Sequence, residues 1–254
     1  MKRYGLTREG WIRLAVVAAF ILGFEALCRL GVLPRTVVLP PSEMAISLWH
    51  LLDTGEFNAD IASTLQDVAI ASALSIVLGF AIGIAIHAIP RLRATLEPLL
   101  ASYYAIPTFM FYPVFIVVFG VSDRAIIAIA VLLSIVAMIA STLTGLDRIP
   151  RVLRKTAAIY RMGLARRALL IDLPAAAPHL FTGIKLAFAY AFIGVIASEF
   201  ILSGQGIGYQ IAYAYNNFEN RKMYGLMLLV IVVATVANAV LDSIDRRLQS
   251  RLQR

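Results

Sequence analysis

Charged residues and cysteine are scarce in this chain. Of its 254 residues only 15% are charged, whereas 60% are hydrophobic, and the mean hydropathy is +0.82. Soluble domains carry about a quarter charged residues. The shortage of charge therefore excludes a soluble globular protein and indicates an integral membrane protein. The single cysteine, Cys28, excludes an internal disulfide bond.

Further absences exclude classes of chemistry. The sequence contains no Gly-x-x-x-x-Gly-Lys-Ser/Thr phosphate loop, so any ATP hydrolysis must come from a partner. Its three histidines, His50, His87 and His179, show no metal-ligand spacing, which argues against a metal site. No internal repeat is visible, so a transporter built from this chain would take its symmetry from a second subunit.

Long apolar runs dominate the rest of the chain. At about 20 residues per span they predict six transmembrane helices. These cover approximately residues 11–30, 63–89, 96–119, 125–143, 183–202 and 223–241. The third run contains Pro98, Pro107 and Pro113, and we expect a kinked helix that faces protein or a pathway rather than lipid.

The whole chain, residues 1–254, is predicted to be one transmembrane domain. Residues 1–62 would form the first span and an outer interfacial segment, residues 63–243 the core, and residues 244–254 a cytoplasmic tail. The apolar run at 11–27 is long for a signal peptide and no Ala-x-Ala site follows it, which favours an uncleaved span.

The basic residues are concentrated between the fourth and fifth spans. Residues 147–167, here called the basic segment, hold seven of the 23 Lys and Arg residues. If both termini are cytoplasmic, 18 of the 23 lie on inner segments and five on outer ones. Basic residues favour the cytoplasmic side of short loops. We therefore expect both termini and the basic segment to be cytoplasmic.

Two outer segments are longer than turns. Ser42 follows a Leu-Pro-Pro sequence and is a candidate N-cap for a short amphipathic helix at the membrane interface. Residues 203–217 begin with a glycine-rich stretch that suits a tight loop. Residues 211–215 either dip back towards the membrane or belong to an outer surface loop with interfacial tyrosines.

The basic segment and the residues after it resemble the cytoplasmic signature of permease subunits from prokaryotic ABC importers. That signature is Glu-Ala-Ala, then Gly, then Ile-x-Leu-Pro. Here Thr156-Ala157-Ala158 is followed by Gly163 and by Ile171-Asp172-Leu173-Pro174. Thr156 stands where Glu is usual, Gly163 falls one place late, and the spacing from Gly163 to Ile171 is two residues short.

Other stretches are similar to the subgroup that imports aliphatic sulfonates, taurine, nitrate and vitamin precursors. They are Leu-Pro-Pro-Ser-Glu at 39–43, Glu-Pro-Leu-Leu at 97–100 with Pro107 and Pro113, Ser-Glu-Phe at 198–200, and Gly-Ile-Gly-Tyr at 206–209. Together they span nearly the whole chain.

The resemblance implies an all-α membrane protein with six transmembrane helices and a cytoplasmic coupling-helix loop between helices 4 and 5. It implies a bacterial inner-membrane permease that works as a homodimer. Its partners would be two cytoplasmic ATP-binding subunits and an extracytoplasmic solute-binding protein, with no nucleic acid. The chain would not itself be an enzyme and would bind no cofactor; ATP and Mg would bind the ATPase.

The same resemblance assigns ATPase coupling to a set of residues in and after the basic segment. We expect helices over 151–162 and 164–170, a break at Gly163 because glycine accepts unusual backbone angles, and an end at Pro174. The alternative is a basic loop that only anchors on anionic lipid. The coupling residues would be Thr156, Ala157, Ala158, Gly163, Ile171, Leu173 and Pro174.

The translocation pathway should lie between two copies of the chain. Aromatic residues in membrane helices also serve as packing or interfacial residues, and that alternative stays open. Glu199 follows an apolar run, so it belongs to the pathway or gate, reaches the interface, or pairs with Arg221 or Lys222. The other candidates are Tyr103, Tyr104, Pro107, Phe109, Phe111 and Tyr112.

Two other classes of function compete with an ATP-driven importer. An ATP-independent secondary transporter or channel predicts an internal repeat or several intramembrane charges. A membrane enzyme predicts clustered His, Asp or Cys at one membrane face. The sequence favours neither. It leaves the substrate open among sulfonates, taurine, nitrate and vitamin precursors.

Overall fold

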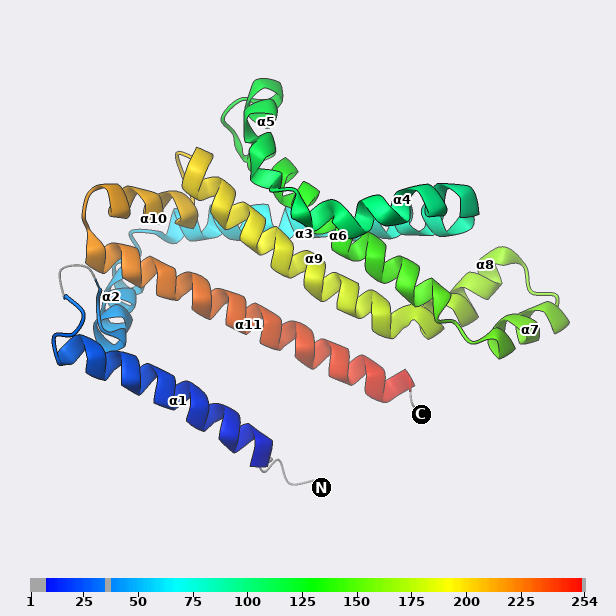
Figure 1. Ribbon diagram of the computed structural model, residues 1–254, viewed down its shortest axis with the longest axis horizontal. Coiled ribbons are helices and arrows are strands. Elements are labelled where there is room, and N and C mark those ends of the chain that lie inside the picture. The colour runs from blue at the N-terminus through cyan, green and yellow to red at the C-terminus, as the bar shows by residue number, and fades with distance from the viewer. Residues whose placement is uncertain (1–7, 35–37, 253–254) are drawn as a thin grey trace. The chain divides into compact units, whose positions relative to one another are not determined.

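The computed structural model describes residues 8–34 and 38–252, and this part of the chain is helical and contains no strand. Lys2, Arg3, Arg35 and Arg254, which entered the charge count, lie outside the described residues. In chain order the α-helices are α1 (Arg8–Arg29), α2 (Pro41–Thr54), α3 (Asn58–Ala88), α4 (Pro90–Ser102), α5 (Tyr112–Phe119), α6 (Asp123–Asp147), α7 (Arg151–Ile159), α8 (Leu164–Arg167), α9 (Leu173–Leu202), α10 (Ile207–Asn216) and α11 (Asn220–Leu252) (Figure 1).

Within the described residues, five stretches of helix are long and apolar enough to cross a membrane, and a sixth span results if one bent helix pair is counted. The bent pair is Pro90–Ala105 with Thr108–Phe119, and its two arms meet at 93°. Two short 3₁₀ turns, Tyr103–Ala105 and Thr108–Phe111, flank Pro107 at the bend. The expected all-α fold and the expected kink in the third span are both confirmed. The kink arises because proline removes a backbone hydrogen-bond donor.

Helix boundaries differ from prediction at the start of the fifth span and at the end of the sixth, where α11 continues to Leu252. The predicted start was residue 183, but α9 begins at Leu173 and follows directly on α8 and a π-helical turn, Ala168–Asp172. The predicted end at Pro174 is wrong, because Pro174 lies in the first turn of α9, where a missing N–H is tolerated. Residues 211–215 lie within α10.

The chain divides into two compact units, which we describe separately. Unit 1 comprises Met1–Asn58 and Gln210–Ile231, and unit 2 comprises Ala59–Tyr209 and Val232–Arg254. The single transmembrane domain expected over residues 1–254 stays a prediction.

Ser42 connects α1 to α2 in unit 1. Its hydroxyl donates to the Glu25 carboxylate at 2.6 Å, and its backbone N–H donates to the other carboxylate oxygen at 3.0 Å. Arg29 pairs with the same carboxylate at 2.7 Å. The N-cap role predicted for Ser42 is wrong, because α2 begins at Pro41 and Pro40 occupies the N-cap position.

Small residues allow α3, α6 and α9 to pack closely in unit 2. A Cβ added at Gly83 of α3 would lie 2.7 Å from the Cβ of Thr142 on α6. One added at Gly194 of α9 would lie 2.8 Å from the Cα of Ala130, also on α6. Such close approach is how helices associate in membranes, where lipid removes most of the hydrophobic driving force. These three helices form the rigid frame that positions the sites below.

Candidate functional site

A buried carboxylate holds the turn between α9 and α10 in unit 2. Glu199 is only 1% exposed. Its carboxylate accepts hydrogen bonds from the Thr64 hydroxyl at 2.8 Å and from the Gly208 N–H at 2.8 Å. The Thr64 oxygen in turn accepts the Ile207 N–H at 2.8 Å. These residues, with Asp60 and Gly206, are called the Glu199 cluster.

Two glycines make the Glu199 cluster possible. Gly206 has φ +97°, a conformation that favours glycine, and its N–H donates to the Asp60 carboxylate at 2.7 Å. A Cβ at Gly206 would strike the Glu199 carboxyl, and one at Gly208 would strike the Ile196 carbonyl. The turn can therefore follow the carboxylate only with glycine at both places. The alternative that Glu199 reaches the membrane interface is wrong, because its side chain is buried. Lys222, one of the partners considered for it, pairs within unit 1 with Glu56 and Glu219.

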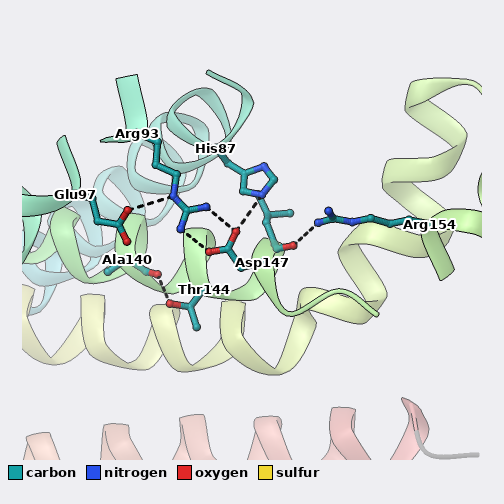
Figure 2. Close-up of polar contacts among 8 residues, drawn as sticks. His87, Arg93, Glu97, Ala140, Thr144, Asp147 and Arg154 are labelled. Atoms are coloured by element: carbon teal, nitrogen blue, oxygen red, sulfur yellow. Dashed lines mark hydrogen bonds and ion pairs between the residues drawn. The ribbon is translucent and has the colours of Figure 1, made fainter. Parts of the chain in front are cut away.

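The opposite end of the α3–α6–α9 frame carries the Asp147 network (Figure 2). Arg93 donates to both oxygens of Asp147, at 2.7 and 2.6 Å. His87 lies 3.4 Å from the same carboxylate, and Glu97 lies 3.5 Å from Arg93. The Asp147 side chain is 37% exposed, so water screens these pairs far more than it screens Glu199. The Asp147 network ties the ends of α3 and α4 to the last residue of α6.

The basic segment forms two short helices that extend beyond α6 and α9 (Figure 1). The break predicted at Gly163 is confirmed in place but not in cause. Gly163 has φ −65° and ψ 157°, which any residue adopts. The left-handed residue at the break is Arg161, with φ +46°. A Cβ at Gly163 would meet nothing within 4 Å, so this chain itself does not require glycine there.

The tip of the basic segment exposes large apolar side chains despite its high charge. Ile159, Tyr160 and Leu164 are 79%, 72% and 85% exposed. Of the alanine pair, Ala157 is buried within the chain, whereas Ala158 is exposed. Only Ala158 therefore offers its surface to a partner.

The remaining signature residues lie where the basic segment rejoins the bundle. The Thr156 hydroxyl donates to the Val152 carbonyl at 3.0 Å, within α7. Ile171 is buried, Leu173 half-buried and Pro174 exposed. Ile171, Leu173 and Pro174 therefore lie at the junction where the basic segment leads into α9.

A model of the family described as the inner membrane component of binding-protein-dependent transport systems matches residues 44–254. The chain belongs to this family. It is thus an inner-membrane transport permease, and the predicted importer function is confirmed over the alternatives.

Named relatives cover most of the permease. It is 28% identical to a nitrate import permease of Leptolyngbya laminosa, over 89% of this chain and 80% of the relative. It is 21% identical to a taurine transport system permease of Escherichia coli (strain K12), over 97% of this chain and 91% of the relative. A chain of the MetNI methionine ABC transporter, solved in inward-facing conformations, superposes with a TM-score of 0.66 and 17% identity. That match covers 76% of this chain and 95% of the other, and it supports the fold.

Two of the three tyrosines proposed for the pathway contact other helices of unit 2. The Tyr103 hydroxyl donates to the Leu132 carbonyl of α6 at 2.6 Å. Tyr104 stacks on Tyr190 of α9, with ring centroids 5.2 Å apart. Both contacts fasten the bend between α4 and α5 to the frame.

The other pathway candidates lie at or beyond the bend. Pro107, Phe111 and Tyr112 are exposed, and Phe109 is half-buried. Among the described residues, none of the four makes a side-chain hydrogen bond or ring contact with Glu199. Their role in the pathway stays a prediction.

Several residues that build the permease escaped the sequence reasoning. Lys185 of α9 pairs with Asp242 and Asp245 of α11 at 3.0 and 2.9 Å. The spacing of Gly79 and Gly83, four residues apart, is a known helix-packing signal and could have predicted the contact of α3 with α6. The Lys185 pairs, by contrast, join positions 57 and 60 residues apart and leave no local pattern.

Proposed function

We propose that two copies of this permease enclose the translocation pathway and that the basic segment couples it to two cytoplasmic ATPase subunits. ATP and Mg would bind those subunits, and a solute-binding protein would deliver the solute on the outer side. Both termini would be cytoplasmic, as the 18 inner and five outer basic residues favour. The relatives it matches are transport permeases, which agrees with hydrolysis in a partner.

One observation carries the coupling role: the exposed apolar tip at Ile159, Tyr160 and Leu164. Ile159 and Tyr160 lie outside the candidate spans, and Leu164 is the first residue of one. Exposing large apolar side chains to water costs free energy, and such patches mark protein interfaces. Tyrosine at the centre of an interface is a frequent anchor of binding energy. Closure of the ATPase dimer would push on this tip and move α6 and α9 as rigid bodies, because the segment connects them directly.

The substrate we propose is a small solute of the sulfonate, taurine, nitrate or vitamin-precursor type, with an oxyanion favoured. The nitrate and taurine permeases similar to this chain are named for solutes that carry an oxyanion. Tyr103, Tyr104, Pro107, Phe109, Phe111 and Tyr112 would border the pathway at the bend. Glu199 would act by holding the α9–α10 turn, since its carboxylate is already engaged.

Transport itself is tested in proteoliposomes that contain the permease, its ATPase and the solute-binding protein encoded with it. We expect ATP-dependent uptake of labelled taurine or nitrate, with the other solutes compared by competition. Uptake that persists without the ATPase or without ATP would refute the importer assignment.

The coupling contact is tested by Gly163→Phe. A Cβ at Gly163 would meet nothing within 4 Å, so permease yield and thermal stability should not change. ATPase co-purification should fall about tenfold, the equivalent of ~1.4 kcal/mol, because the side chain intrudes into the docking surface. Gly23→Phe, at another glycine with nothing within 4 Å, is the matched control and should bind the ATPase normally. Normal binding by Gly163→Phe would place the coupling contact elsewhere.

A further inference from the structure

A cavity opens beside the basic segment, and all of its lining residues belong to unit 2. Its volume is about 430 Å³. It is bounded by the last turns of α3 and α6 and by the start of the helix that leads into α9. Most of its lining is apolar, and the principal apolar residues are Phe80, Ile84, Leu146, Ile149 and Leu164.

The polar lining of the cavity carries an uncompensated positive charge. Arg167 pairs with Asp172 at 3.1 Å, so that pair is neutral, and its Arg167 Nε and Asp172 Oδ1 atoms are buried with no hydrogen bond among the described residues. Arg154 uses one guanidinium nitrogen to donate to the Leu146 carbonyl at 2.7 Å (Figure 2). Its Nε is buried and has no hydrogen-bond partner among the described residues. A buried donor on a charged group costs free energy until it finds an acceptor, which predicts an anionic ligand here.

The position of the cavity along the candidate membrane spans restricts what that ligand can be. His87 and Leu146 lie in the last turns of two candidate spans, and Leu164 is the first residue of a third. The cavity therefore lies where hydrocarbon gives way to lipid headgroups. A π-helical turn, Ala168–Asp172, forms part of the wall through its first and last residues. Such turns are frequent at functional sites.

We propose that the cavity binds one anionic phospholipid, with its phosphate on Arg154 and an acyl chain against Phe80 and Ile84. An amphiphile matches both halves of the lining, whereas a free anion would leave the apolar wall exposed to water. Basic pockets between membrane helices recognise such headgroups. The bound lipid would brace α7 against α3 and α6. This inference goes beyond the proposed function. It depends on that function only for the assignment of the cavity to the cytoplasmic side of the membrane.

The test measures lipid binding by the full-length permease alone, purified in a neutral detergent. Phosphatidylglycerol should raise its melting temperature and stay bound in native mass spectrometry, and phosphatidylcholine with the same acyl chains should do neither. Arg154→Gln should weaken phosphatidylglycerol binding about tenfold, as expected for loss of a charged hydrogen bond. Arg151→Gln removes the same charge from an exposed residue outside the lining and should bind normally.

A second variant protects the test from a folding defect in Arg154→Gln. Ile84→Trp fills the apolar wall from an exposed position, so it should fold, keep Arg154 and still lose phosphatidylglycerol. Equal losses in Arg154→Gln and Arg151→Gln would overturn the proposal in favour of general surface charge. Equal stabilisation by inorganic phosphate would overturn it in favour of a free anion. Because no ATPase is present, these results are independent of the Gly163→Phe experiment.

Discussion

The two ends of the α3–α6–α9 frame satisfy their charges in opposite ways. In the Glu199 cluster a carboxylate that is 1% exposed is held by a hydroxyl and a backbone N–H. In the Asp147 network a carboxylate that is 37% exposed is held by Arg93 and lies near His87. At the first end, the Glu199 carboxylate finds its hydrogen-bond partners within the chain. The other leaves a buried Arg154 nitrogen without a partner and an apolar tip in the open.

The difference indicates where outside components act. A buried polar cluster with its partners in place rigidifies the chain around it, so the α9–α10 turn should move with α9 as one body. Exposed ion pairs contribute little and exchange partners readily. The end with the Asp147 network is therefore the end at which an ATPase or a lipid can change the structure at low cost.

The largest effect on the free energy of unfolding is expected at the end with the Glu199 cluster, from Glu199→Ala. The change leaves the Gly208 N–H and the Thr64 hydroxyl without an acceptor and opens a cavity, so the free energy of unfolding should fall by about 3 kcal/mol. The measurement is SDS-induced unfolding in mixed micelles. Glu199→Gln, which keeps the volume and one acceptor oxygen, should lose about half as much. A loss below ~0.5 kcal/mol for Glu199→Ala would show that the Glu199 cluster does not stabilise the α9–α10 turn.

Thr64→Val should produce an intermediate effect. Valine has the same shape but neither donates to Glu199 nor accepts the Ile207 N–H, so the free energy of unfolding should fall by about 1.5 kcal/mol. The same unfolding assay applies. Combined with Glu199→Ala, the loss should be smaller than the sum, because the two variants remove one shared hydrogen bond. Simple additivity would mean that the two side chains act separately.

The smallest effect on the free energy of unfolding is expected at the end with the Asp147 network, from Arg93→Gln. Breaking its pair with Asp147 should lower the free energy of unfolding by less than about 1 kcal/mol, because the pair is solvent-exposed. Repeating the unfolding in 1 M salt should shrink the difference, since ions screen exposed charges. Glu97→Gln, whose side chain is 63% exposed, serves as the reference and should change almost nothing. An Arg93→Gln loss as large as that of Glu199→Ala would remove the contrast between the two ends.

Helices and their order were readable from the sequence because membrane spans need continuous apolar runs. The bend in the third span was readable because Pro107 cannot donate a backbone hydrogen bond. The start of α9 was misplaced because hydropathy marks where apolar residues begin, whereas a helix extends as far as its backbone bonds allow. The α3 to α6 contact was signalled by Gly79 and Gly83 but was not recognised.

The functional sites divide in the same way. The basic segment was found because its charges and signature residues are neighbours in the chain. The contact of Glu199 with Thr64 was not, because Thr64 is 135 residues away and nothing local to either residue points to the other. Gly163 was found but the reason for glycine was misinterpreted. Its backbone conformation is one that any residue adopts, so a requirement for glycine would come from a partner that occupies the open space around it.

Sequence alone determined that this chain spans a membrane, that its third span bends and that one loop is basic, because lipid and proline impose strong local rules. It also determined the family, through the order of short motifs. Tertiary structure decided which carboxylate is buried and satisfied, which buried arginine nitrogen lacks a hydrogen-bond partner and which apolar side chains face outwards. Those outcomes depend on atoms brought within about 3 Å of each other from distant positions, a distance at which hydrogen bonds form and which no local pattern encodes.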